Sequence, residues 1–180
     1  MNEVLNMKLI EKTKYIRLLV LDVDGVMTDG KIIMDHMGHE IKNFDVKDGH
    51  GIKILMKYGI DVILLTGRRS SVVEHRARDL GIGEIHQGIF NKLGVSEEIL
   101  KKRFLDYANI AYVGDDIVDI PLLKRVGFSV AVADAADDVK KCVDYVTRNK
   151  GGHGAVREVC ELILQGQDKW DDVAKKYEFL

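Results

Sequence analysis

The chain has 180 residues, 46% of them hydrophobic, and its 27 Lys and Arg nearly balance its 29 Asp and Glu to give a formal net charge of -2. This length and apolar content suit one compact domain, which we expect to span residues 1–180. The charges are interspersed, with no basic stripe for nucleic acid and no polybasic tail for a membrane surface. We therefore expect a small soluble partner, and neither nucleic acid nor a membrane.

The N-terminal segment and the cysteines favour the cytoplasm. Charges interrupt the first sixteen residues, and no later apolar run approaches the roughly 20 residues that a membrane helix needs. Cys142 and Cys160 lie far apart in the chain and lack the spacing of a zinc site. This cysteine usage suits a reducing compartment and predicts no disulfide framework.

Strand-like and helix-like segments alternate along the chain. The strand-like runs are 18–23, 61–66, 109–114 and 128–133, and the longer segments of helical spacing include 70–81 and 96–108. Runs that are apolar throughout are typical of parallel strands buried on both faces, and right-handed crossovers then place helices on both sides of the sheet. The predicted fold class is therefore α/β, a three-layer αβα sandwich with a parallel sheet.

Two segments depart from this alternation. Residues 31–46 contain two strand-like stretches around Gly38 and predict a β-hairpin that interrupts the first crossover. Near the end of the chain, a glycine-rich stretch precedes apolar residues at helical spacing, from Val156 to Ile163, which predicts a docked helix. Residues 166–180 are expected to form a C-terminal tail.

Asp22 and Asp24 close the first apolar run, at the edge of an open α/β sheet where ligands bind. Burying two neighbouring carboxylates is costly unless something neutralises them, and a hard cation with oxygen ligands would do so. Mg²⁺ is the natural candidate. The alternative is that the pair merely caps the next turn, which would explain one aspartate but not both.

Further polar residues follow other predicted strands. They are Thr66, Gly67, Asp115, Asp116 and Asp119. A hydroxyl and a backbone N–H after one strand can face an anion, and the aspartates add carboxylates at the same edge. Lys92 follows a short strand near the start of a helix, where its point charge could hold phosphoryl oxygens.

The segments DVDGV, LLTGR, NKL and GDDIVDIP, in this order, resemble the four motifs of the haloacid dehalogenase superfamily of aspartate-nucleophile phosphatases. FDVKDGHGIK, HQG, SVAVADA and DYVTRNKGGHGAVREVCELIL extend the likeness over residues 15 to 168. Over this span the chain resembles the family of phosphatases that act on 3-deoxy-D-manno-octulosonate 8-phosphate, in lipopolysaccharide precursor biosynthesis. The resemblance implies a Rossmannoid fold in which the small hairpin stands in place of a cap domain.

The resemblance also implies catalytic roles. Asp22 would be the nucleophile that forms an aspartyl-phosphate, and Asp24 would act as acid and then as base. Thr66 and Lys92 would hold phosphoryl oxygens. The metal ligands would be the side chains of Asp22 and Asp115 and the backbone carbonyl of Asp24, with Mg²⁺ as the cofactor. Asp116 and Asp119 would lie behind these ligands, with Asp119 orienting Lys92.

The substrate residues implied by the same resemblance are more numerous. They are Asp24, Asp45, Val46, Lys47, Asp48, Gly49, Lys53, Thr66, Gly67, Arg68, Arg76 and Lys92. The chain departs from the family in carrying Asp45 where asparagine is common and Lys53 where arginine is common. Lysine cannot offer a bidentate fork to a carboxylate. Arg68 favours the eight-carbon substrate, because relatives that act on the nine-carbon sugar acid phosphate tend to have glutamate there.

The small hairpin also bears on assembly. The family forms a homotetramer in which the hairpins pair and a neighbouring subunit, with C-terminal tails, covers the substrate, and we expect the same here. Three alternatives stay open: a nine-carbon sugar acid 9-phosphate phosphatase, a noncatalytic oligomerisation module of this fold, and a response-regulator receiver. Motif order disfavours the receiver, because Asp22 and Asp24 share the first strand.

Overall fold

The computed structural model describes the backbone of residues 3–179 and the side chains of residues 7–179. Its centre is a six-stranded sheet of order β5-β4-β1-β6-β7-β8, in which every neighbouring pair is parallel. The strands are β1 Leu18–Leu21, β4 Asp61–Thr66, β5 Glu84–Gln87, β6 Ile110–Gly114, β7 Phe128–Ala131 and β8 Tyr145–Val146. The predicted parallel α/β sheet is therefore confirmed.

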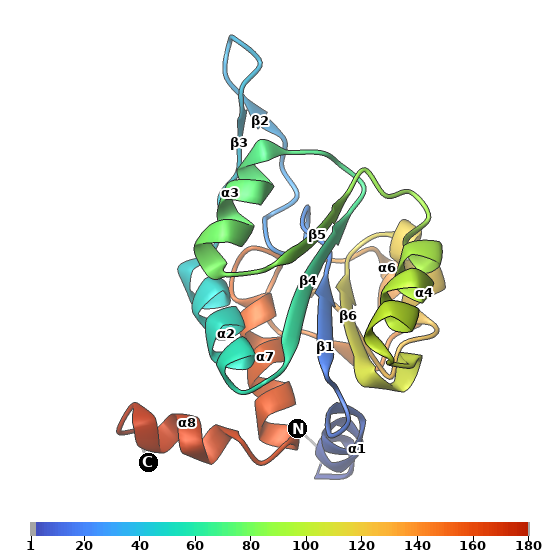
Figure 1. Ribbon diagram of the computed structural model, residues 1–180, viewed down its shortest axis with the longest axis vertical. Helices are drawn as coiled ribbons and strands as arrows, with labels where there is room; N and C mark the ends of the chain where they lie inside the picture. Colours follow the sequence, from blue (N-terminus) through green and yellow to red (C-terminus); the bar gives the residue numbers. More distant parts are fainter. Residues whose placement is uncertain (1–2, 180) are drawn as a thin grey trace.

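Helices cover both faces of this sheet (Figure 1). One face carries α2 Val46–Lys57, α3 Ser71–Leu80 and α7 Ala155–Gly166, and the other carries α4 Lys92–Arg103, α5 Ile120–Leu123 and α6 Asp137–Lys140. The N-terminal helix α1, Glu3–Thr13, packs against α7. Two 3-10 turns, η1 Tyr107–Asn109 and η2 Ile117–Asp119, flank β6. The predicted three layers are confirmed.

The central strand β1 explains where the site lies. All four residues of β1 are buried, because β4 and β6 pair with its two edges and helices cover its two faces. Its apolar side chains fill the core, and the first polar residue after them is Asp22. The chain therefore leaves the core at the carboxyl edge of the sheet.

The predicted hairpin is present, with shorter strands than expected. β2 Ile33–Met34 and β3 Glu40–Ile41 pair antiparallel, and Gly38 adopts φ +82 in the turn between them. The hairpin projects beyond the carboxyl edge of the main sheet (Figure 1). Its predicted end at residue 46 is wrong, because the Asp45 carboxylate accepts the backbone N–H of Lys47 and thereby starts α2 at Val46.

Part of the predicted C-terminal tail forms a helix. Within the predicted tail of residues 166–180, α8 spans Trp170–Lys176 and buries Val173 and Ala174. Lys169 Nζ donates to the Tyr58 carbonyl at 3.0 Å, which fixes the start of α8 near the end of α2. Figure 1 shows α8 at the end of the molecule opposite the hairpin.

The helix expected over 96–108 begins earlier, at Lys92, and ends at Arg103. Asn91 supplies the start signal, because its side-chain oxygen accepts the backbone N–H of Gly94 at 3.1 Å. Within residues 3–179, none of the helices combines the length and apolar character needed to cross a membrane.

Candidate active site

A cleft of about 480 Å³ opens at the carboxyl edge of the sheet, between the loops after β1, β4 and β6 and the start of α4. It is lined by Asp22, Asp24, Gly30, Ile32, Thr66, Gly67, Arg68, Ile89, Phe90, Lys92, Asp115, Asp116 and Val118. The lining includes the residues that were predicted to act as nucleophile, acid and base, phosphoryl holders and carboxylate metal ligands. The structure thus brings together residues from three strand ends that are distant in the sequence.

Asp22 lies at the floor of the cleft. Its backbone N–H donates to the Val113 carbonyl at 3.1 Å, which extends the β1–β6 ladder by one residue and fixes the Asp22 backbone. The residue is only 7% exposed, and its Oδ2 lies 3.1 Å from Lys92 Nζ. Burial raises the pKa of the Asp22 carboxyl above its usual range, although Lys92 opposes this shift.

Lys92 is the buried cation beside this carboxylate. Its ammonium lies 3.1 Å from Asp22 Oδ2, 2.6 Å from Asp119 Oδ1 and 3.1 Å from Tyr112 Oη. Burial alone would lower the pKa of Lys92, but the charges of Asp22 and Asp119 raise it above the usual value. Lys92 therefore stays charged, and Tyr112 is a contact that the sequence did not predict.

Asp119 is fully buried and fixes both Lys92 and the loop after β6. Its Oδ1 accepts from Lys92 and from the Tyr112 hydroxyl, and its Oδ2 accepts the backbone N–H groups of Asp115 and Asp116 at 3.0 and 3.3 Å. Asp116 itself is exposed, and its carboxylate accepts the Ile117 backbone N–H at 2.7 Å. The oxygens of Asp119 are therefore committed to holding other groups.

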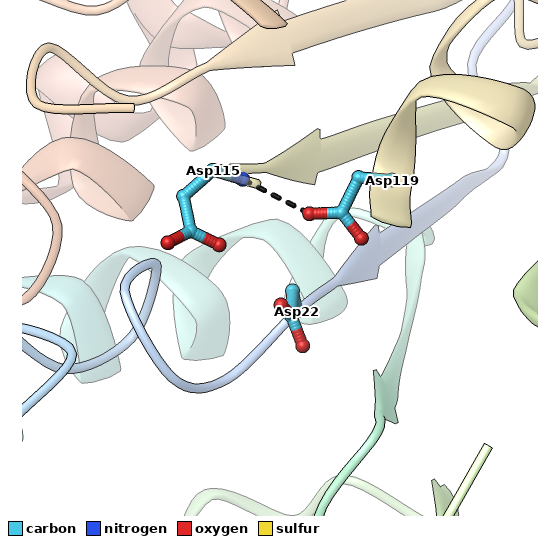
Figure 2. A group of neighbouring side chains, drawn as sticks. All are labelled: Asp22, Asp115 and Asp119. Atoms are coloured by element: carbon cyan, nitrogen blue, oxygen red, sulfur yellow. Dashed lines mark hydrogen bonds between the residues drawn. The ribbon is translucent and has the colours of Figure 1, made fainter. Parts of the chain in front are cut away.

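The carboxylates of Asp22, Asp115 and Asp119 face one small space, with oxygens within 4.8 Å of one another (Figure 2). Since Asp119 is already engaged, Asp22 and Asp115 are the two that can bind a metal ion. Burial, and then the charges of Asp22 and Asp119, raise the pKa of Asp115 to about 7. Such a pair of converging carboxylate oxygen donors fits a hard divalent cation.

Gly25 makes room for one of these ligands. It adopts φ +90, and a Cβ added there would lie 2.0 Å from Asp115 Oδ2. The left-handed backbone and the close approach both require glycine. The glycine of the DVDG segment therefore lets the loop after β1 pack directly against the Asp115 carboxylate.

Asp24 lies on the cleft wall, where it is contacted by Lys42, which was not predicted, and by Arg68, which was predicted as a substrate residue. Lys42 Nζ, from the base of the hairpin, donates to Asp24 Oδ1, and Arg68 Nε lies 3.7 Å from Asp24 Oδ2. Glu40 of β3 contacts both cations, at 3.1 Å from Lys42 and 2.8 Å from Arg68. The hairpin therefore contributes charged side chains to the cleft.

Several predicted substrate residues lie elsewhere in this chain. Val46, Gly49, Lys53 and Arg76 line a separate hollow of about 240 Å³ together with His50, Asp79 and Leu80. Arg76 Nη2 donates to the Asp45 carbonyl at 3.2 Å, and a Cβ on Gly49 would lie 2.4 Å from this nitrogen. Gly49 thus gives space to Arg76, and the structure does not bring this group into the cleft.

The other members of the segment 45–49 have structural contacts. The Asp45 carboxylate caps α2, and Lys47 is exposed. Asp48 is 2% exposed and accepts the backbone N–H of Gly154 at 3.3 Å and of Arg157 at 2.7 Å. The Asp48 carboxylate therefore joins α2 to the start of α7 within this chain, and the predicted contact of segment 45–49 with the substrate stays a prediction.

Comparisons with known proteins agree with this geometry. Residues 79–159 match the model of the haloacid dehalogenase-like hydrolase family. The chain is 49% identical over 163 residues to the 3-deoxy-D-manno-octulosonate 8-phosphate phosphatase of Escherichia coli (strain K12), with 91% of this chain and 87% of the relative covered.

Solved structures show the same relationship. The 3-deoxy-D-manno-octulosonate 8-phosphate phosphatase of Yersinia pestis has a TM-score of 0.89 at 49% identity, covering 91% of this chain and 88% of the other. That of Moraxella catarrhalis, solved in complex with a magnesium ion, a phosphate ion and a KDO molecule, has a TM-score of 0.93 at 39% identity, covering 94% and 98%. The chain thus belongs to the 3-deoxy-D-manno-octulosonate 8-phosphate phosphatase family of haloacid dehalogenase-like hydrolases.

Proposed function

We propose that this chain is a Mg²⁺-dependent phosphatase that hydrolyses 3-deoxy-D-manno-octulosonate 8-phosphate to the free sugar acid and phosphate. The observation that carries the proposal is the meeting of Asp22, Lys92 and Asp115 in one cleft, in a chain 49% identical to a phosphatase of that name. The cleft offers a carboxylate nucleophile, a buried cation and a pair of metal ligands together.

The reaction proceeds in two displacements at phosphorus. Asp22 attacks the phosphorus atom to form an aspartyl-phosphate, while the bond from phosphorus to the sugar oxygen breaks and that oxygen takes a proton from Asp24. A water molecule then attacks the same phosphorus and gives its proton to Asp24. This second step releases phosphate and restores the Asp22 carboxylate.

The chain's own groups stabilise the transferring phosphoryl group. Lys92 and the Thr66 hydroxyl hold its oxygens, and the buried position of both side chains keeps water from competing with these contacts. Asp22, Asp115 and the backbone carbonyl of Asp24 would hold Mg²⁺. When bound, this ion supplies positive charge that neutralises the phosphoryl oxygens.

Arg68 supports the assignment to a sugar acid. Its Nε is buried and has no hydrogen-bond partner among residues 7–179, although it lies in the cleft lining beside Asp24. The Arg68 side chain as a whole is 39% exposed, so its guanidinium can pair with a carboxylate of the substrate. We therefore propose that Arg68 recognises the carboxylate of the eight-carbon substrate.

The substrate is tested by phosphate release from the eight-carbon sugar acid 8-phosphate, a nine-carbon sugar acid 9-phosphate and an aryl phosphate. We expect the eight-carbon compound to have the highest kcat/KM. Arg68→Glu should lose about 1–3 kcal/mol more transition-state stabilisation for this compound than for the aryl phosphate. A preference of the parent protein for the nine-carbon compound would overturn the substrate assignment.

We also propose that the chain forms a homotetramer, in the cytoplasm, in which a neighbouring subunit covers the cleft. Exposed apolar side chains on the hairpin support this: Ile32, Met34, Met37 and Ile41. Phe90, at the cleft, is 91% exposed. Such a cluster at a site that must exclude water is typical of a surface covered by another chain.

The assembly is tested by light scattering on the parent protein and on Met34→Asp. We expect a tetramer for the parent and smaller species for the variant. Phe104→Ser is the matched control, because Phe104 is 94% exposed but follows the end of α4, away from the hairpin. A monomeric parent protein with full activity would refute the covered site.

A further inference from the structure

Four charged side chains of alternating sign form a closed ring on the cleft wall. Lys42 Nζ donates to Asp24 Oδ1 and lies 3.1 Å from Glu40 Oε1. Arg68 Nη2 donates to the same Glu40 oxygen at 2.8 Å, and Arg68 Nε lies 3.7 Å from Asp24 Oδ2. Asp24 therefore sits between two cations that are both held by Glu40.

The burial of Lys42 distinguishes it from an ordinary surface lysine. Its side chain is 1% exposed, whereas Lys31, in the segment leading into the same hairpin, is 75% exposed. Burying an ammonium is unfavourable unless it is paired and hydrogen-bonded, and it also costs side-chain entropy. The Lys42 ammonium is stabilised by two carboxylates, one of which is the Asp24 group proposed to transfer the proton.

Glu40 is a fixed acceptor for Lys42. The Ser70 hydroxyl donates to Glu40 Oε2, and the Ser70 backbone N–H donates to Gln87 Oε1 at 2.7 Å. Burial would raise the pKa of Glu40, but hydrogen bonds from Ser70 and Lys42 lower it below the usual value. The base of the hairpin is therefore tied to the loop after β4 and to the end of β5.

We infer that Lys42, held by Glu40, is a positioning residue that fixes the Asp24 carboxyl where it can reach the leaving-group oxygen. This inference rests on the proposed phosphatase function. It means that the hairpin carries part of the active site of its own subunit, in addition to any contact with a neighbouring one.

The rate that is lost when Lys42 is removed should depend on the leaving group. When the bond from phosphorus to a sugar oxygen breaks, the departing alkoxide needs the proton of Asp24. A p-nitrophenolate leaves as a stable anion and needs little protonation. Loss of the Asp24 position should therefore slow the first displacement for a sugar phosphate much more than for p-nitrophenyl phosphate.

The experiment compares kcat/KM of Lys42→Met on the eight-carbon sugar acid phosphate and on p-nitrophenyl phosphate. This parameter is chosen because kcat/KM includes no step after the leaving group departs. We expect a fall of about 10- to 100-fold for the sugar phosphate and of less than about threefold for the aryl phosphate. Lys42→Arg should recover part of the lost activity, because it keeps the cation. Lys31→Met is the matched control and should match the parent on both substrates.

Glu40→Gln provides a second variant, which removes the charge that holds Lys42 and should show the same substrate-dependent loss in smaller degree. If thermal unfolding shows that Lys42→Met is not folded, kcat/KM on the two substrates is compared for Lys42→Arg and Glu40→Gln instead. Equal losses on both substrates, or none on either, would overturn the inference. A parent protein inactive on both substrates would instead overturn the proposed function.

Discussion

Lys92 and Asp119 form a fully buried ion pair, with Lys92 Nζ 2.6 Å from Asp119 Oδ1. The Tyr112 hydroxyl donates to the same oxygen at 2.6 Å and accepts from Lys92 at 3.1 Å. Because removing one member of such a group leaves the others buried without compensation, the three side chains act together. They aim the ammonium of Lys92 at Asp22, beside which the proposed reaction would place the phosphoryl group.

Tyr112→Phe should therefore weaken both the fold and the reaction. Loss of the hydroxyl leaves Asp119 and Lys92 each one hydrogen bond short, and we expect the free energy of unfolding to fall by about 1–2 kcal/mol, with a lower kcat. Urea unfolding and phosphate-release kinetics measure the two effects. Tyr107→Phe is the control, because the Tyr107 hydroxyl is buried without a partner among residues 7–179. Equal effects of the two substitutions would contradict this role of Tyr112.

Gly25→Ala should damage the metal site specifically. The added Cβ would lie 2.0 Å from Asp115 Oδ2, so the carboxylate must move. Gly38→Ala is matched in backbone conformation, at φ +82 against +90, but its Cβ would meet no described atom within 4 Å. Both should lose about 1–2 kcal/mol of stability through left-handed strain.

Titration of phosphate release against Mg²⁺ separates the two glycine variants. Only Gly25→Ala should need more Mg²⁺ for half-maximal activity. An unchanged Mg²⁺ requirement in Gly25→Ala would show that Asp115 does not bind the metal.

The raised pKa values make the effect of Mg²⁺ depend on pH. Burial raises the pKa of Asp22, and burial with neighbouring charges raises that of Asp115 to about 7. A folded protein with raised carboxyl pKa values binds more protons than the unfolded chain, so without Mg²⁺ its stability should rise as the pH falls from about 8 to about 5. Protons and Mg²⁺ compete for the same oxygens.

Thermal unfolding with and without Mg²⁺ across this pH range measures the competition. The increase in Tm caused by Mg²⁺ should be largest near pH 8 and should shrink through pH 7 to about 5.5. Asp48, whose pKa burial raises to about 6, should contribute equally with and without the metal. A Mg²⁺-induced shift that does not change with pH would mean that these carboxyls are not its ligands.

The carboxyl edge of the sheet was predictable because its polar residues directly follow apolar strands. Asp22, Thr66 and Asp115 each end or follow a run of buried residues, and parallel pairing brings those ends together. Lys42 was not predictable in this way. It is 18 residues from Asp24, and it follows a two-residue strand whose side-chain alternation is too short to indicate a direction.

The contacts of Tyr112 and of the Asp48 side chain were not predicted, for different reasons. A tyrosine inside an apolar strand is typical of the core, and its hydroxyl partner depends on where η2 places Asp119. The position of Asp48 had a usable signal. Asp45 starts the helix, so Asp48 shares a helical face with Ile52 and Leu55, and all three are buried. Helical spacing therefore predicts that Asp48 faces the core.

Asp22 is the proposed nucleophile of a sugar acid phosphatase. The most direct measurement is phosphate release from 3-deoxy-D-manno-octulosonate 8-phosphate with Mg²⁺, for the parent protein and for Asp22→Asn. We expect steady turnover by the parent and none by the variant, with the variant still folded by thermal unfolding. Appreciable turnover by Asp22→Asn, or no phosphate release by the parent, would contradict this role of Asp22.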